Sequence, residues 1–414
     1  MAGALVALCA PSASAASDLK FFSPDTFELI GDVRVTAADG EKSWLDGGFG
    51  KLRSSGGGDD FRVRPQLGNL NLIWQPQFTW SLSATIVGSF QGGERTEAGL
   101  NQAYLSFKPM RGSKIAVSAR AGLMFPPVSL EHEGADWHVK DSITPSAINS
   151  WFGEEVRPAA LEGTLAANPG QHKLRATAAI FAANDTAGTL LTFRGWALHD
   201  RTTLAWRRQP LPPLGDDVGS YQAPFTHPLL DVGPGFARRP GYYAKLLWQP
   251  PIPVRFELFR YDNRAKPADV NSDLEWGWRT EFNHAGVVAD LGSRTELKLQ
   301  AIDGRTRMGF AEEGRRWVDN RFRSAFVLLT HPFGPFGIAV RAEAFRTRNH
   351  GSDVDSEYDE TGWSAMLAGK HEWGRITGLV ELLHVSSRRE SREDAGVKPR
   401  QRQTQLQAEA RIHW

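Results

Sequence analysis

The chain lacks most of the features that would assign it to a common class of soluble or helical protein. Its one cysteine, Cys9, lies in an N-terminal segment predicted to be removed, so disulfides and zinc–thiolate sites are excluded from the remaining chain. No stretch approaches the roughly 20 consecutive apolar residues that a membrane helix needs. The formal net charge of +1 is far from the basic excess of a nucleic-acid-binding protein, so we expect no nucleic-acid partner.

The N-terminal segment has the order of a secretory signal. Residues 4–10 form a short apolar stretch, and residues 13–15 offer the small side chains of a cleavage site. The basic residues that usually open such a signal are missing, so the translation start is left open. We predict that residues 1–16 are a signal peptide and that the protein is exported.

Apolar and polar residues alternate one by one in many parts of the chain, most clearly at residues 401–414. Leu406, Ala408, Ala410, Ile412 and Trp414 alternate with polar residues, so a strand here has one apolar face and one polar face. A strand of this kind with a terminal aromatic residue suits the wall of a transmembrane β-barrel. An amphipathic strand of a soluble sandwich would alternate in the same way.

Similar alternation recurs along the whole chain. Short connections, most of them rich in Pro and Gly, alternate with longer polar ones, as expected for a barrel with short periplasmic turns and long external loops. The predicted fold class is all-β, a transmembrane antiparallel β-barrel of about 16 strands formed by residues 17–414. The strands are expected at residues 26–38, 61–75, 78–90, 99–108, 114–125, 156–167, 172–183, 240–249, 253–262, 273–284, 294–308, 320–331, 336–348, 361–371, 375–386 and 401–414.

Two connections are much longer than the others. Residues 126–155 and 184–239 are predicted to be long external or constriction loops. Within the second connection, residues 191–206 could form a further strand, which would give an odd number of strands. We favour a hairpin or plug-like loop there, because it preserves the alternation of short and long connections.

The polar face of the predicted strands carries charges of both signs. If this face lines a water-filled lumen, oppositely charged neighbours either stiffen the wall as ion pairs or set up a transverse field across the pore. The predicted pore-lining residues are Arg34, Arg120, Arg175, Lys245, Arg255, Arg279, Lys298, Arg341, Glu257, Glu281 and Glu343.

The first long connection is also the best candidate for a constriction. It combines many charges with two tryptophans, and it would either fold into the lumen or remain an ordinary external loop. The predicted constriction residues are Glu131, Glu133, Asp136, Trp137, Glu154 and Arg157.

Catalytic and metal-binding motifs are weak. No Gly-x-Ser-x-Gly elbow occurs, and His132–Glu133 is not followed by a second histidine at helical spacing. The acidic residues 352–357 could bind Ca²⁺, but they lack the glycine and distal glutamate of an EF-hand loop and are better explained as a solvated loop. We therefore assign no catalytic residue, no metal and no cofactor.

Three short segments resemble a known family. They are GLMFPPVSLE at residues 122–131, ITPSA at 143–147 and EEVRP at 154–158. This order of a strand ending in Gly, an aromatic residue and Pro, then a loop, then a Glu-Arg-type strand start is similar to porins of the phosphate-selective O/P-like superfamily. Where those porins often have Glu-Arg this chain has Glu-Val-Arg, and it has no dense arginine or lysine ladder, so the resemblance implies a porin without implying phosphate selectivity.

The resemblance implies passive diffusion of small hydrophilic or anionic solutes through a barrel in contact with the lipid of a bacterial outer membrane. A homotrimer is expected by analogy with porins of this size. Two other classes stay open: an outer-membrane barrel enzyme or adhesin, and an exported soluble carbohydrate-binding β-protein. The 14 tryptophans would suit either a membrane interface or a sugar-binding surface.

Overall fold

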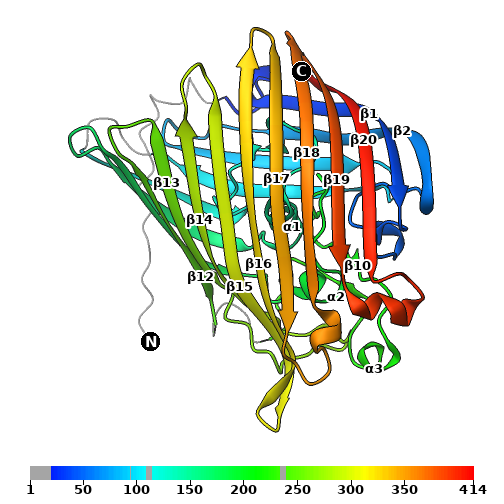
Figure 1. Ribbon diagram of the computed structural model, residues 1–414. Coiled ribbons are helices and arrows are strands. Elements are labelled where there is room, and N and C mark those ends of the chain that lie inside the picture. The colour runs from blue at the N-terminus through cyan, green and yellow to red at the C-terminus, as the bar shows by residue number, and fades with distance from the viewer. Residues whose placement is uncertain (1–19, 94, 109–113, 234–238) are drawn as a thin grey trace, which may run out of the picture.

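The computed structural model describes residues 20–93, 95–108, 114–233 and 239–414. The predicted signal peptide, residues 1–16, lies outside these residues. Sixteen antiparallel strands form one closed barrel, in which β1 (Phe27–Gly40) pairs with β20 (Arg400–His413) to complete the wall (Figure 1). Closure leaves no sheet edge unpaired, which is the condition for a β-sheet to reside in a membrane.

The other wall strands follow one another in sequence order, with two excursions. They are β2 (Gly58–Trp74), β3 (Leu82–Gln91), β4 (Glu97–Phe107), β5 (Ile115–Leu123), β8 (Ala159–Ala167), β9 (Lys173–Ala182), β12 (Gly241–Gln249), β13 (Val254–Asp262), β14 (Arg279–Asp290), β15 (Glu296–Glu312), β16 (Arg315–Phe333), β17 (Phe336–Asn349), β18 (Glu360–Trp373) and β19 (Ile376–Arg388).

The excursions and loops hold the short elements. Between β5 and β8 lie β6 (His132–Glu133), β7 (His138–Val139) and α1 (Ala147–Glu155); between β9 and β12 lie α2 (Thr189–Phe193), β10 (Gln209–Pro210), α3 (Asp216–Gly219) and β11 (Phe225–Thr226). Short 3₁₀ turns occupy Pro24–Thr26, Trp44–Asp46, Ser356–Tyr358 and Glu390–Ala395. Of the helices that the structure describes, none is both long enough and apolar enough to cross a membrane.

The barrel and the order of its strands confirm the prediction from the alternating sequence. Several strand limits differ from the prediction by a few residues, and two differences are larger. The strand expected at residues 273–284 begins at Arg279 and continues to Asp290. The strands expected at 294–308 and 320–331 extend toward each other and pair almost to their tip as a tight hairpin of β15 and β16. Residues 191–206 do not form a wall strand; they contain the end of α2 and irregular chain.

The outer face of the wall is apolar over a continuous band. On β17 the exposed residues Ile338, Val340, Ala342 and Ala344 alternate with buried ones, and on β20 the exposed residues include Leu406 and Ala408. This alternation is the one expected for strands with one face toward lipid. The soluble alternative is excluded, because a closed barrel with an apolar outside cannot be solvated on that face.

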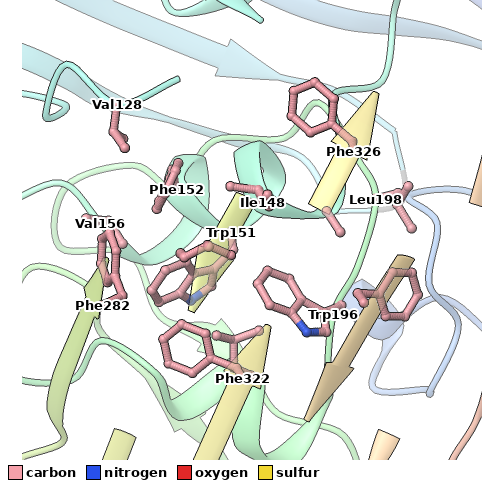
Figure 2. Packing of buried hydrophobic residues seen from close by; sticks show 14 of the residues in the cluster. Val128, Ile148, Trp151, Phe152, Val156, Trp196, Leu198, Phe282, Phe322 and Phe326 are labelled. Carbon is pink, nitrogen blue, oxygen red and sulfur yellow. The ribbon is translucent and has the colours of Figure 1, made fainter. Parts of the chain in front are cut away.

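The lumen is largely filled by the chain itself. All residues of α1 are buried, and α1 lies inside the barrel with the irregular chain around Trp196 (Figures 1 and 2). Trp151 contacts Phe282 and Phe322 of the wall, with ring centroids 5.3 and 5.2 Å apart. Over much of the cross-section, the water-filled lumen expected from the polar face of the strands is therefore replaced by an apolar core between the wall and this inserted chain. We call residues 124–158 and 183–205 the plug.

Candidate permeation path

The inner wall has an apolar side and a polar side. From β8 to β19 the wall presents Phe259, Phe282, Phe322, Phe345 and similar side chains to α1, and these form the main hydrophobic core. On β20 and β1–β4 most of the inward residues are polar, and many are amides, although Ile30, Ile73 and Val87 form a small apolar cluster there. The polar ones are Asp32, Arg34, Thr36, Asn71, Thr85, Ser89, Gln91, Asn101, Gln102, Gln401, Gln403, Gln405, Gln407, Glu409 and Arg411. A hydrophilic solute would therefore meet more polar groups along this second side than along the β8–β19 side, where charged pairs such as Lys245–Glu257 interrupt an otherwise apolar core.

Arg34 is the centre of the polar side. Its guanidinium lies 2.7 Å from a carboxylate oxygen of Asp32, 2.8 Å from Asp200 and 3.0 Å from Glu409. Asp200 comes from the plug and also pairs with Arg53 at 2.9 Å. The two arginines hold the pKa of the Asp200 carboxyl well below its usual value, although its burial acts in the opposite direction. Arg34 therefore ties the wall to the plug and is itself fully neutralised by carboxylates.

A small polar cavity lies beside this cluster. Asn71, Asp136, Thr202 and Arg411 are among the side chains that line it, and its free volume is about 30 Å³. That is room for about two water molecules. The cavity lies between the wall strands β1–β3 and β20 on one side and plug residues around 136–143 and 200–202 on the other.

The plug residues at the cavity are held to the wall by a few polar contacts. Asn71 donates a hydrogen bond to Asp136 at 3.2 Å, Gln102 donates to the carbonyl of Ala135 at 2.7 Å, and Arg411 donates to the carbonyl of Val139 at 2.8 Å. Trp137 stacks between Phe125 and His132, with ring centroids 4.6 and 4.8 Å away.

His138 adds a titratable group to the same segment. Burial would lower the pKa of its imidazole, but hydrogen bonds to Asp136 at 2.7 Å and to Glu133 outweigh burial and raise the pKa to about 9. His138 is therefore a cation at neutral pH, and it balances the carboxylate of Asp136. Glu133 is half-exposed and also lies 3.8 Å from Lys140.

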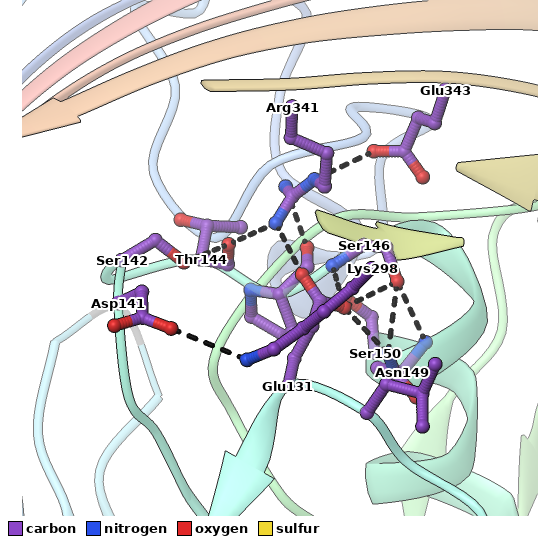
Figure 3. A network of polar contacts seen from close by, with 12 residues as sticks. Glu131, Asp141, Ser142, Thr144, Ser146, Asn149, Ser150, Lys298, Arg341 and Glu343 are labelled. Atoms are coloured by element: carbon purple, nitrogen blue, oxygen red, sulfur yellow. Dashed lines mark hydrogen bonds and ion pairs between the residues drawn. The ribbon is translucent and has the colours of Figure 1, made fainter. Parts of the chain in front are cut away.

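A network of hydrogen bonds and ion pairs fixes the start of α1, and the chain just before it, to the wall (Figure 3). Arg341 lies 2.7 Å from Glu131 and donates to the carbonyls of Thr144 and Pro145 at 2.8 and 3.0 Å. Glu131 accepts in turn from Ser146 and Asn149 at the start of α1. Lys298 of β15 pairs with Asp141 of the plug at 3.3 Å.

The end of α1 joins the two parts of the plug. Glu154 forms two hydrogen bonds with Arg194, both 2.7 Å, and lies 2.6 Å from His199. Burial raises the pKa of Glu154, but its contacts with Arg194 and His199 outweigh burial and lower the pKa to about 2. Burial and the neighbouring Glu154 raise the pKa of Glu155 to about 8. Arg157 follows and donates to Asn101 of β4 at 3.2 Å.

The remaining charged residues predicted to line the pore lie on the β5–β13 side, except Glu343, which lies on β17. Arg120 pairs with Glu162 at 2.7 Å, and Lys245 and Arg255 both pair with Glu257, at 2.6 and 2.9 Å. Arg175 lies on the inward face of β9, at its exposed end near the short turns. Glu343 lies 3.5 Å from Arg341.

The prediction that Arg279 and Glu281 face the lumen is wrong. Thr280 and Phe282 are the buried, inward residues of β14, so their neighbours Arg279 and Glu281 lie on the outer face. Arg279 pairs there with Asp262 at 3.1 Å. The physical reason is the plug: where the lumen is filled by an apolar core, the aromatic face of a strand points inward and the charged face points outward.

Sequence reasoning missed several residues that hold the plug. Asp200 and Arg194 lie in the second excursion, which was expected to be an external or plug-like loop, but neither residue was singled out in it. Lys51, Glu360 and Arg392 form a buried ion-paired cluster at the loop end of the barrel. No periodic signal marks these positions, because they lie in irregular chain or at strand ends.

With the geometry described, comparison with known proteins addresses the fold. No family model matches the chain, and no curated protein matches it by sequence. Solved structures do. The outer membrane channel DcaP of Acinetobacter baumannii superposes with a TM-score of 0.57 at 12% identity, over 95% of this chain and 99% of that one. The fold is that of an outer-membrane porin.

Two further structures of outer-membrane proteins have the same overall fold. An anion-selective porin from Comamonas acidovorans gives a TM-score of 0.51 at 11% identity, and a loop L8 deletion mutant of OmpT, an outer membrane protein of Vibrio cholerae, gives 0.50 at 7% identity. Each comparison covers 94% of this chain and 99% of the other. The apolar outer band and this shared architecture place the barrel in a bacterial outer membrane. At these identities the likeness bears on the fold and not on the solute.

Proposed function

We propose that this barrel is an outer-membrane channel for small hydrophilic solutes, with a path along the polar side of the lumen formed by β20 and β1–β4. The observation that carries the proposal is the contrast between the two sides of the inner wall. The β8–β19 side is sealed by an apolar core around Trp151, whereas the β20–β4 side presents amides, hydroxyls and paired charges. Hydrogen-bonding groups of this kind can replace part of the hydration shell that a hydrophilic solute loses in a narrow path.

The charges at the cavity favour polar solutes over strongly anionic ones. Arg34 is the basic residue most central to the path, and three carboxylates surround it. An arginine neutralised in this way attracts anions much less than a free one. The carboxylate and arginine side chains still offer donors and acceptors to hydroxyl and amide groups of a passing solute.

Passage requires movement of the plug residues beside the cavity. A cavity of about 30 Å³ admits water but not a sugar or an amino acid. The segment around Asp136 is held to the wall by the few polar contacts described above, whereas α1 is buried in the main core. Segments with few apolar contacts open at lower free-energy cost than core elements. The proposal is therefore that residues 132–140 move. Glu131, Asp141 and Ile143 stay in place with α1, because they are bound to Arg341, Lys298 and Glu381 of the wall.

The proposal does not include catalysis or a bound cofactor. It does include a homotrimer, on the analogy with porins of this size, and sedimentation of the detergent-solubilised protein tests that part separately.

A matched pair of substitutions on β2 tests the path. Asn71 points into the cavity, whereas its neighbour Leu72 points to lipid. In planar bilayers the wild-type protein should give discrete conductance steps, Asn71→Trp should reduce them severalfold, and Leu72→Trp should leave them unchanged. The proposal fails if correctly folded wild-type barrels give no steps, or if both tryptophan variants conduct like the wild type.

A further inference from the structure

The outer wall carries a row of arginines that face one another across neighbouring strands. Arg305 on β15, Arg321 on β16 and Arg348 on β17 are directly opposite in the strand register. Arg323 and Arg346 form another opposed pair on β16 and β17. We call these five residues the arginine row. Like charges in directly opposed cross-strand positions destabilise a sheet unless something neutralises them.

The row lies at one level of the barrel, directly beyond the apolar band. On β16 the outward residues Ala325, Val327 and Leu329 belong to the apolar band. Arg321 and Arg323 continue the same outward face beyond this band, toward the end of the barrel that carries the long connections. On β17 the order is the same, with Arg346 and Arg348 directly beyond Ala344. Long connections of outer-membrane barrels face outside the cell. The row is thus at the level of the headgroups of the outer leaflet.

Carboxylates of the protein neutralise only part of the row. Asp319 pairs with Arg305, Asp303 with Arg323, and Asp359 with Arg348 at 2.7 Å. The side chains of Arg321 and Arg346 are exposed and have no ion-pair partner within the described residues. Each lies directly opposite at least one other arginine of the row, so the row retains two uncompensated cations at its centre.

The opposed pairs continue around the barrel at the same end. Arg388 and Arg400 are opposite on β19 and β20, and Arg279 and Arg307 on β14 and β15. Three of these further arginines are paired with carboxylates: Arg279 pairs with Asp262, Arg307 with Glu281, and Arg388 with Glu390. The excess of positive charge on the outer face is therefore concentrated at Arg321 and Arg346 of the arginine row.

We propose that the arginine row binds the phosphate groups of an anionic lipid in the outer leaflet, with Arg321 and Arg346 as its principal ligands. A guanidinium offers paired N–H donors that match phosphate oxygens, and a phosphate between two opposed arginines removes their repulsion. The lipid, rather than a dissolved anion, is the occupant because the row borders the apolar band, so that acyl chains can lie against Val327, Leu329 and Val340 while the phosphate lies on the row. The row faces away from the lumen, so the proposal is independent of the solute path.

The test measures lipid binding to the whole protein in detergent. The probes are lipid A with both phosphates, the same lipid after removal of the phosphates, and inorganic phosphate, with bound lipid counted by native mass spectrometry. The double variant Arg321→Gln/Arg346→Gln should bind phosphorylated lipid A roughly thirtyfold more weakly than the wild type. It should bind the dephosphorylated lipid equally. Raising the salt concentration should weaken wild-type binding and leave the variant little affected.

Arg375→Gln is the matched control. It removes one positive charge, against two in the double variant, from an exposed arginine in the short turn between β18 and β19, at the opposite rim of the barrel. Binding of lipid A to this variant should equal that of the wild type. The assignment is overturned if the double variant binds phosphorylated lipid A as tightly as the wild type. It is also overturned if inorganic phosphate binds as tightly as the lipid, or if the double variant changes only the oligomeric state.

Discussion

The carboxylate of Glu343 accepts a hydrogen bond from the backbone N–H of Ala147, at 2.7 Å, and so fixes the first turn of α1 to the inner face of β17. Glu381 of β19 does the same for the N–H groups of Ile143 and Thr144, at 2.8 and 2.9 Å. The free N–H groups and positive end of a helix favour a carboxylate there. These wall carboxylates explain how an irregular segment is held at a defined position in the lumen.

Removing the Glu343 carboxylate should loosen the start of α1. Glu343→Ala leaves the Ala147 N–H and Ser364 without their buried acceptor, at a cost of about 1–3 kcal/mol. Hydrogen exchange at residues 143–150 should become faster while exchange in the wall strands is unchanged. Glu372→Ala, at an exposed position near a short turn, is the control. Equal protection in all three proteins would contradict the anchoring role.

Trp151 should be the residue on which the position of α1 depends most. Trp151→Ala removes the side chain that contacts Trp196, Phe282 and Phe322, which should cost about 3–5 kcal/mol. Thermal unfolding should shift downward, and conductance should rise and become noisier as the apolar side of the lumen opens. Trp363→Ala removes a lipid-facing tryptophan and should do neither. An unchanged conductance in a destabilised Trp151→Ala protein would mean that α1 does not seal that side.

The sequence predicts the wall of this barrel far better than its interior. The alternation at residues 336–348 and 401–414 is imposed by lipid on one face, so it reports strand position directly. The filling of the lumen depends on contacts between distant segments, such as Asp200 with Arg34, which leave no periodic trace. Arg279 and Glu281 were placed inward because apolar residues were expected to face lipid. This expectation failed because the inner face of β14 contacts the apolar plug, and because its outer face extends beyond the lipid at this end.

The pKa of His138 predicts a pH dependence of the plug. Its pKa is raised from 6.5 to about 9 by Asp136 and Glu133, so protonation stabilises the folded state. This stabilisation is complete below about pH 6.5 and is lost as the pH rises through 9, and it amounts to roughly 2–3 kcal/mol. Wild-type stability should therefore fall between pH 7 and 9.5 relative to that of His138→Asn. Parallel pH profiles for the two proteins would show that His138 is not a buried cation.

A charge on the lipid-facing side of β20 should hinder assembly according to its depth. Leu406 is exposed on the outer face, and Leu406→Arg should cost about 2–4 kcal/mol if it lies near the middle of the membrane. Thr404→Arg, one step toward the arginines at the loop end, should cost about 0–1 kcal/mol. The yield of heat-modifiable, folded barrel measures both. Equal yields, or a larger loss for Thr404→Arg, would show that Leu406 does not lie deeper in the membrane than Thr404.

The most direct test of the channel proposal is to fix residue 136 to residue 71 and record single-channel currents. In a Cys9→Ser background, Asn71→Cys/Asp136→Cys places two thiols across a contact that is 3.2 Å long in the wild type. A cleavable thiol cross-linker should abolish the conductance steps, and reductive cleavage should restore them. The pair Glu372→Cys/Thr377→Cys, opposite each other on β18 and β19, is the control and should conduct whether linked or not. Identical currents before and after linking residues 71 and 136 would contradict a path that opens by movement of this segment.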